Sequence, residues 1–263
     1  MPPAPTTAPM TSPIPSEPRT DALYHAAPRG ALAVWLALAG VAAIFFVQLA
    51  LVLVGARLEL VMGASFSAAI ILLVLATRPL PGVLGVRRVP ARFLVAAALV
   101  GLASWYLRLR LGTLFTLPGN TKGLEAAAVD PDFVISLITV AVLPAIAEEL
   151  IFRGVIARSL ARHSQILAIL VSAVLFAAYH MNPMQSALVF PFGLALGYIA
   201  VRADSIVPTM IGHAINNAIG IAIARHDLRS VVAAIDAWPQ VSLVVSSVVV
   251  AGGLALAWKA APA

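Results

Sequence analysis

The sequence predicts an all-α fold, a polytopic transmembrane helix bundle of about eight spans that follows a disordered, proline-rich N-terminal tail. Of the 263 residues, 61% are hydrophobic and 11% are charged, whereas soluble domains carry about 45–50% apolar and about 25% charged residues. The apolar residues form continuous stretches of span length, without the alternation that is typical of a β-barrel. The chain has no cysteine, which excludes disulfides, thiolate catalysis and Cys-ligated metal sites.

The first 29 residues differ in composition from the rest of the chain. They contain eight prolines among Ser, Thr and Ala residues, and such a segment buries too little apolar surface to offset its ordering entropy. We therefore expect a disordered tail over residues 1–29 and a single transmembrane helical domain over residues 30–263. The apolar run after the tail is much longer than the hydrophobic region of a signal peptide, so it is expected to remain as the first span.

The expected spans follow from the need for about 17–25 apolar residues to cross a bilayer as a helix. The third and fifth are short, so the count is seven or eight. A segment between the third and fourth spans, Gly112–Asp132, is expected to be an interior loop with a re-entrant or interfacial stretch. The eight expected spans are Gly30–Ala56, Leu60–Ala76, Phe93–Leu107, Phe133–Arg158, Gln165–Tyr179, Ser186–Val201, Ile206–Ala224 and Val241–Trp258.

The basic residues indicate the orientation, because short cytoplasmic loops carry an excess of Lys and Arg. Eleven of the 17 basic residues are assigned to the side of the N-terminus, including Arg153 and Arg158, and six to the other side, including Arg108. Both termini are therefore expected in the cytoplasm. Topology accounts for the net charge of +6, and no nucleic-acid partner is expected.

Two adjacent glutamates and an arginine interrupt the apolar pattern of the fourth span, at Glu148, Glu149 and Arg153. Glu149 and Arg153 are four residues apart in the order that favours an ion pair, which leaves Glu148 without a local cation. Adjacent side chains on a helix point about 100° apart, so the two carboxylates are not expected to share one partner. Glu148 is then a candidate general base, unless both glutamates simply cap the helix end at the water interface.

Two histidine motifs follow on later spans. His180 lies four residues after Phe176 and ends an apolar run before Pro183, a position where a histidine is either catalytic or structural. His213 and Asn217 share one face of an otherwise apolar helix, where they form either a polar site or a hydrogen bond between helices.

The depths of these residues can be compared by counting from the turns. Glu149 and His180 lie about 21 and 25 Å from the turn between their helices, at 1.5 Å per residue. His213 and Asn217 lie about 12 and 18 Å from the next loop on the same side of the membrane. The three motifs are therefore expected to converge inside the bilayer.

A glutamate base with two histidines and an asparagine suits the activation of a water for attack on an amide. Glu148 would take the proton, His180 would hold and orient the water, and His213 with Asn217 would donate to the developing oxyanion. The signatures of other intramembrane proteases are absent from the sequence, namely Gly-x-Ser-Gly, Gly-x-Gly-Asp with Tyr-Asp, and His-Glu-x-x-His.

In this order on successive helices, Glu-Glu-x-x-x-Arg, Phe-x-x-x-His and His-x-x-x-Asn resemble the motifs of the CPBP family. This family includes CaaX prenyl endopeptidases of the Rce1 type, bacteriocin-processing and self-immunity proteins, and C-terminal sorting proteases. The resemblance implies a glutamate-dependent intramembrane endopeptidase with a catalytic core at about residues 134–224. The positions that match the family's functional residues are Glu148, Glu149, Arg153, His180, His213 and Asn217.

A catalytic zinc is the alternative to a metal-free mechanism. One of the two glutamates with His180 and His213 makes a two-histidine, one-carboxylate set. Asn217 is a poor zinc ligand, and two histidines spaced on one helix are missing, so the expectation is no cofactor and no bound metal.

The expected substrate is a membrane-embedded or lipidated protein or peptide, cut near its C-terminus or membrane anchor and delivered by the lipid bilayer. The spread of the family and the Ala-rich composition favour a bacterial cytoplasmic (inner) membrane. Two alternatives are a non-catalytic self-immunity or scaffold protein that uses the polar cluster for helix packing, and a transporter, against which the absence of repeated halves argues. A Gly-x-x-x-Gly motif from Gly193 to Gly197 predicts close helix packing in every case.

Overall fold

The computed structural model describes residues 27–80, 82–114 and 132–258, and within these ranges the chain is all helical, without a strand. The expected disordered tail lies outside the described residues, apart from residues 27–29. Most of the expected interior loop, residues 115–131, lies outside them as well.

The helices follow the order that the apolar stretches predict. The 29 residues from Phe133 to Ala161 form one continuous helix made of five segments. The helices and helical segments are α2 (Gly30–Leu53), α3 (Leu58–Thr77), α4 (Ala91–Gly112), α6 (Phe133–Ser136), η1 (Leu137–Val142), α7 (Leu143–Glu148), η2 (Glu149–Ala157), α8 (Arg158–Ala161), α9 (Gln165–Tyr179), α10 (Pro183–Ala203), α11 (Val207–Ala224), α12 (Arg229–Asp236) and α13 (Pro239–Trp258).

All eight expected spans correspond to helices in the structure. Seven described helices are long and apolar enough to cross a membrane, and α9, with 15 residues, is apolar but shorter. The third span is longer than expected, because α4 extends over 22 residues. The short helix α12 was not expected. The Asp236 carboxylate of α12 accepts a hydrogen bond from Tyr106 of α4 at 3.4 Å.

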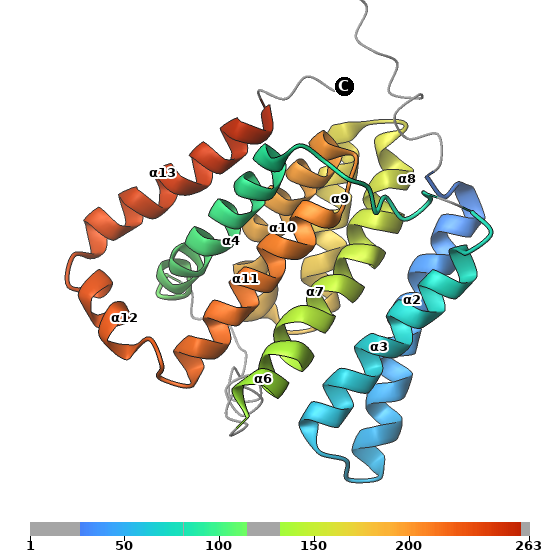
Figure 1. Cartoon of the computed structure of the whole chain (residues 1–263), viewed down its shortest axis with the longest axis horizontal. Coiled ribbons are helices and arrows are strands. Elements are labelled where there is room, and N and C mark those ends of the chain that lie inside the picture. Colours follow the sequence, from blue (N-terminus) through green and yellow to red (C-terminus); the bar gives the residue numbers. More distant parts are fainter. Residues whose placement is uncertain (1–26, 81, 115–131, 259–263) are drawn as a thin grey trace, which may run out of the picture.

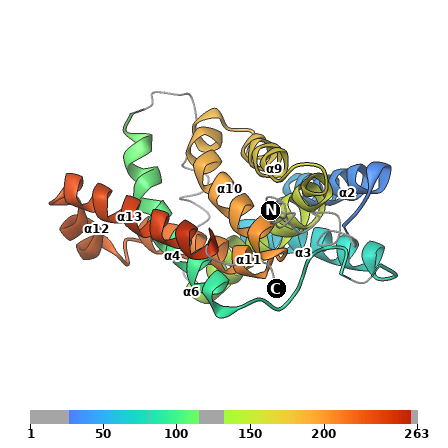
Figure 2. The same cartoon turned by 90° about the horizontal axis from the view of Figure 1, so that it is seen from above.

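The helices alternate in direction, and two helical hairpins flank a central group. In Figures 1 and 2, α2 and α3 lie at one side and α12 and α13 at the other, with α7, α9, α10 and α11 between them. The first residue of α2 and the last of α13 lie at the same end of the bundle, the upper end in Figure 1. The most extensive helix contacts are those of α4 with α11 and α13, of α2 with α3, and of α9 with α10.

The long fourth span contains two π-helical segments, η1 and η2. Pro144 is the second residue after η1. A proline ring would clash with the carbonyl four residues earlier in a regular α-helix, and the wider π turns before Pro144 relieve this clash. The second π-segment begins at Glu149 and contains Arg153. Such segments inside α-helices occur frequently at functional sites.

The outward surfaces of the flanking helices are apolar. Trp35, Phe46 and Leu53 of α2 and Val248 of α13 are all more than half exposed. In a soluble protein a large apolar surface of this kind would be unfavourable, whereas lipid tails solvate it well. The inward surfaces form a core in which Phe152 of η2 packs edge-on against Phe176 of α9.

An ion-pair network connects three segments at the end of the bundle where α2 begins. Asp204 follows α10 in a left-handed backbone conformation, with φ of 45°, and its carboxylate pairs with Arg87 and Arg158. Burial raises the pKa of Asp204, and the two arginines oppose this shift. The network joins the α3–α4 loop, the end of the fourth span and the α10–α11 turn, so it fixes where α11 begins.

Helices α4 and α11 cross at two glycines, Gly101 and Gly212. The close crossing predicts that an alanine at either position is destabilising. A Cβ atom on Gly212 would lie 2.4 Å from the Ala97 carbonyl oxygen, whereas one on Gly220 of the same helix would meet nothing within 4 Å. We expect Gly212→Ala to lower the free energy of unfolding by about 1–3 kcal/mol. The matched control, Gly220→Ala, should leave it unchanged or raise it slightly. Thermal unfolding of both variants in detergent tests this, and equal unfolding temperatures would contradict the close crossing.

Candidate active site

The site begins with a buried ion pair on the second π-segment. Arg153 Nη1 donates to Glu149 Oε1 at 2.8 Å, and neither side chain is exposed. This is the pair that the spacing of the two residues predicts. A carboxylate and a guanidinium are costly to bury singly, so each depends on the other.

The other contacts of Arg153 attach this ion pair to two further helices. Its Nη2 donates to the Gly193 carbonyl of α10 at 2.9 Å, and its guanidinium carbon lies 4.5 Å from the centre of the Phe176 ring on α9. Gly193 also fits closely against α9, because a Cβ on it would lie 3.1 Å from the Phe176 ring. The prediction of close packing at this glycine is confirmed.

His213 of α11 lies between the two glutamates. Its Nδ1 donates to Glu149 Oε1 at 3.0 Å, and its Nε2 lies 3.7 Å from Glu148 Oε2. The expectation that the two carboxylates share no partner is therefore wrong. A third group from another helix fits between them, because the two nitrogens of one imidazole point in opposite directions and so compensate for the angle between adjacent side chains.

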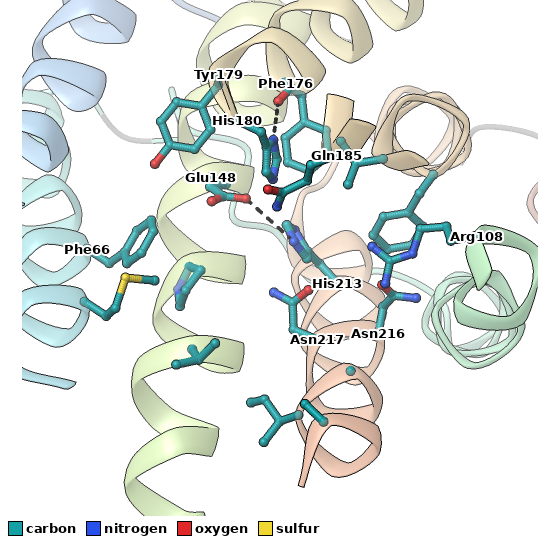
Figure 3. A pocket seen from close by; sticks show the side chains of 18 of the residues that line it. Phe66, Arg108, Glu148, Phe176, Tyr179, His180, Gln185, His213, Asn216 and Asn217 are labelled. Carbon is teal, nitrogen blue, oxygen red and sulfur yellow. Dashed lines mark hydrogen bonds and ion pairs between the residues drawn. The ribbon is translucent and has the colours of Figure 1, made fainter. Parts of the chain in front are cut away.

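Glu148 faces a cavity of about 510 Å³, and Glu149 does not line it. Figure 3 shows Glu148 beside His180 and His213 in the cavity wall. Glu148 is 5% exposed, and its only described ion pair is the one with His213. The sequence-based expectation that Glu148 lacks an arginine partner on its own helix agrees with this geometry.

His180 reaches the cavity from the end of α9. Its Nδ1 donates to the Phe176 carbonyl at 2.9 Å. Since a carbonyl oxygen only accepts, Nδ1 carries the hydrogen, and Nε2 of the neutral ring is left as an acceptor. The Phe176 ring contacts both His180 and His213, at centroid distances of 5.1 and 5.6 Å.

The polar face of α11 continues with two asparagines. Asn217 lines the cavity on the same side of the helix as His213, as the spacing of these residues predicts. Asn216, which the sequence analysis did not single out, donates from Nδ2 to the Gly101 carbonyl of α4 at 3.1 Å, and its Oδ1 has no hydrogen-bond partner among the described residues.

Several other polar residues of the cavity wall were not predicted from the sequence. Arg108 was assigned to a loop, but it lies within α4 and lines the cavity. Arg153, which was counted on the side of the N-terminus for the orientation but predicted within the fourth span, is buried in that span and does not line the cavity. The available signal for Arg108 was a positive charge directly after the last residue of the short expected third span, Leu107. Gln48, Tyr179 and Gln185 are further polar residues that line the cavity.

The described residues do not fit a metal centre. No group of three or more His, Asp or Glu side chains in this part of the chain is arranged to hold a metal ion. His213 Nδ1 is bonded to Glu149 and His180 Nδ1 to a backbone carbonyl, so each ring keeps only Nε2 free. Both bonds are of the kind that orients a histidine side chain.

Fold and site together define the chain as a polytopic helical integral membrane protein with a buried Glu–Arg–His cluster beside a cavity. Residues 130–219 match the Rce1-like family, whose description is type II CAAX prenyl endopeptidase Rce1-like. The matched segment is about a third of the chain and contains all seven specified positions of the three motifs. The resemblance inferred from these motifs is thereby confirmed.

No curated protein and no solved structure matched the chain in the corresponding searches. The family match implies a protease whose substrate is associated with the membrane.

The buried ion pair leads to a prediction about stability. Glu149→Gln leaves the Arg153 charge buried without a carboxylate, and we expect the free energy of unfolding to fall by about 3–5 kcal/mol. The matched control is Glu59→Gln at the exposed start of α3, where Glu59 pairs with Arg57. We expect the control to change the free energy of unfolding by no more than about 0.5 kcal/mol.

The double variant Glu149→Leu, Arg153→Met distinguishes the destabilising effect of an unpaired buried charge from that of lost packing. We expect it to unfold at a higher temperature than Glu149→Gln alone, because it leaves no buried charge without a partner. Equal unfolding temperatures for Glu149→Gln and Glu59→Gln, measured in the same detergent, would contradict a structural role for the pair.

Proposed function

We propose that the chain is an intramembrane glutamic endopeptidase that hydrolyses a peptide bond of a membrane-embedded or lipidated substrate, near its C-terminus or membrane anchor. The observation that carries the proposal is the contrast between the two glutamates. Glu149 is engaged by Arg153 and His213, whereas Glu148 faces the cavity. A carboxylate beside a cavity of this size is placed to act on a bound molecule.

In the proposed reaction Glu148 removes a proton from a water that attacks the scissile carbonyl. The 3.7 Å between Glu148 and His213 Nε2 is longer than a direct hydrogen bond, and such a gap suits a bridging water. His180 Nε2 would accept a hydrogen from the water and so orient its lone pair. Asn217, and His213 when doubly protonated, would donate to the oxyanion that develops.

The remaining two motif residues would act by positioning. Glu149 holds the His213 ring through Nδ1, and Arg153 holds Glu149. Neither residue lines the cavity, so neither is placed to touch the substrate. All six residues therefore have a part in the proposed mechanism, and four of them face the reacting groups.

We further propose that the protein resides in a bacterial cytoplasmic membrane with both termini in the cytoplasm. The bundle begins and ends on the same side. Without the basic residues that lie inside span helices, the remaining ones still divide seven to four in favour of that side.

Glu148→Gln tests the catalytic role. It keeps the shape of the side chain but removes the base, and we expect the processing rate to fall at least about a hundredfold, with an unchanged unfolding temperature. The measurement compares deletion cells that carry the wild-type or the variant gene, with mass spectrometry of the C-termini of membrane-associated proteins. Glu59→Gln is the matched control.

Processing by Glu148→Gln at the wild-type rate would contradict the proposal and favour a protein that uses the polar cluster for packing alone. An unfolding temperature well below that of the wild type would mean that Glu148 is needed for the fold, and processing would then be judged with Glu148→Asp, which keeps a carboxylate but withdraws it from the cavity.

Chelation tests the proposed metal-free mechanism. Because no group of three His, Asp or Glu side chains in the described ranges is arranged to hold a metal ion, we expect the purified protein to keep its activity within about twofold after dialysis against a strong zinc chelator. Loss of activity on chelation, with full recovery on addition of one equivalent of zinc, would contradict the metal-free mechanism and support the two-histidine, one-carboxylate set.

A further inference from the structure

Arg108 is a positive charge inside the third span, outside the segment that matches the family. It lies four residues before the end of α4 and is half-buried in the cavity wall. Its Nε is buried and has no hydrogen-bond partner, and no acidic side chain pairs with it among the described residues. Among the described residues, the Arg108 side chain makes a cation–π contact with the Phe192 ring, whose centre lies 5.8 Å from the guanidinium carbon.

A guanidinium inside a transmembrane helix is energetically unfavourable unless an anion pairs with it. Arginines within transmembrane segments normally pair with acidic groups or mark a pathway for a ligand. The one acidic side chain among the described residues of the cavity wall is Glu148, and its ion pair is with His213. Figure 3 shows Glu148 on one side of His213 and Arg108 on the other, where it points toward Asn216.

The cavity therefore has a negative and a positive end with His213 between them. A peptide that fills it would place its scissile bond near Glu148 and an adjoining part near Arg108. The guanidinium offers a planar set of donors that matches a carboxylate. Phe192, Val189 and Phe66 make much of the remaining wall apolar, and a low-polarity surrounding strengthens such a pairing.

We propose that Arg108 binds a carboxylate of the peptide substrate, so that the protein selects substrates with a negative charge close to the cleaved bond. The inference rests on the proposed function and deepens it, because it names a specificity-determining residue and the chemical group that it recognises. The carboxylate belongs either to the C-terminus of the peptide or to an acidic side chain near it.

A binding experiment tests this without any cleavage. The full chain with Glu148→Gln is purified in a neutral detergent and titrated with three probes. The first is N-dodecanoyl-trialanine with a free carboxylate, the second is its C-terminal carboxamide, and the third is N-dodecanoyl-Ala-Ala-Asp carboxamide. Dissociation constants come from the rise in unfolding temperature with probe concentration.

We expect at least one carboxylate probe to bind about ten to a hundred times more tightly than the neutral carboxamide. When Arg108→Gln is combined with Glu148→Gln, this preference should be abolished. Arg108→Lys in the same background should keep a part of the preference, since an ammonium cannot form the bidentate pair. The matched control is Arg110→Gln, which removes a charge from the same helix. Arg110 pairs with Asp236 and does not line the cavity, so this variant should keep the full preference.

The pattern among the probes identifies the source of the carboxylate. Preference for the first probe alone assigns the C-terminal group, and preference for the third alone assigns an acidic side chain. The proposal is overturned if no probe binds, if all three bind equally, or if Arg108→Gln keeps the preference. If Arg108→Gln does not fold, an undiminished preference in Arg108→Lys overturns it. Failure of the proposed function appears separately, as continued substrate processing by Glu148→Gln in cells.

Discussion

The buried pair of Glu149 and Arg153 is the interaction on which the arrangement of the site depends. Both charges lie where water does not reach them, so they depend on partners from the protein. Glu149 Oε2 and Arg153 Nε have no hydrogen-bond partner among the described residues, and the further partners of the pair come from other helices. Arg153 bonds to the Gly193 carbonyl of α10 and stacks on Phe176 of α9, and Glu149 bonds to His213 of α11. The pair therefore sets the positions of three helices relative to the fourth span.

This constraint also explains why two adjacent glutamates have different surroundings. Once Glu149 is turned toward Arg153, the angle between neighbouring side chains directs Glu148 to another side of the helix, where the cavity lies. His213 reaches both carboxylates because its two nitrogens point in opposite directions. Its bond to Glu149 fixes the direction in which Nε2 points. The pairing of one glutamate thus prepares the surroundings of the other.

Much of the fold and part of the candidate site could be predicted from the sequence, because both follow from the hydropathy and spacing of residues that are close together in the chain. Continuous apolar stretches located all eight helices that correspond to spans, and the four-residue spacings predicted the Glu149–Arg153 pair and the shared face of His213 and Asn217. Arg108 and Asn216 were not predicted as residues of the cavity wall, because their environment depends on the packing of α4 and α11 against other helices. The contact of His213 with both glutamates depends on the crossing of α11 with the fourth span, for which no local pattern exists.

The length of α9 connects the fold to the chemistry. With 15 residues it extends about 22 Å, so the turn after it lies roughly halfway along the 29-residue fourth span. Backbone groups at that depth need partners, and polar side chains of the turn supply them. The Asn182 side chain accepts from the Gln185 amide, Ser186 donates to the Ala177 carbonyl, and His180 donates to the Phe176 carbonyl.

The last of these bonds serves the fold and the site together. It satisfies a carbonyl that the end of α9 would otherwise leave without a donor, and it places the hydrogen of the His180 ring on Nδ1. The unprotonated Nε2 then remains available in the cavity wall. The requirement that a short helix end inside the bilayer with its backbone satisfied therefore also determines which nitrogen of His180 is free to accept a hydrogen bond.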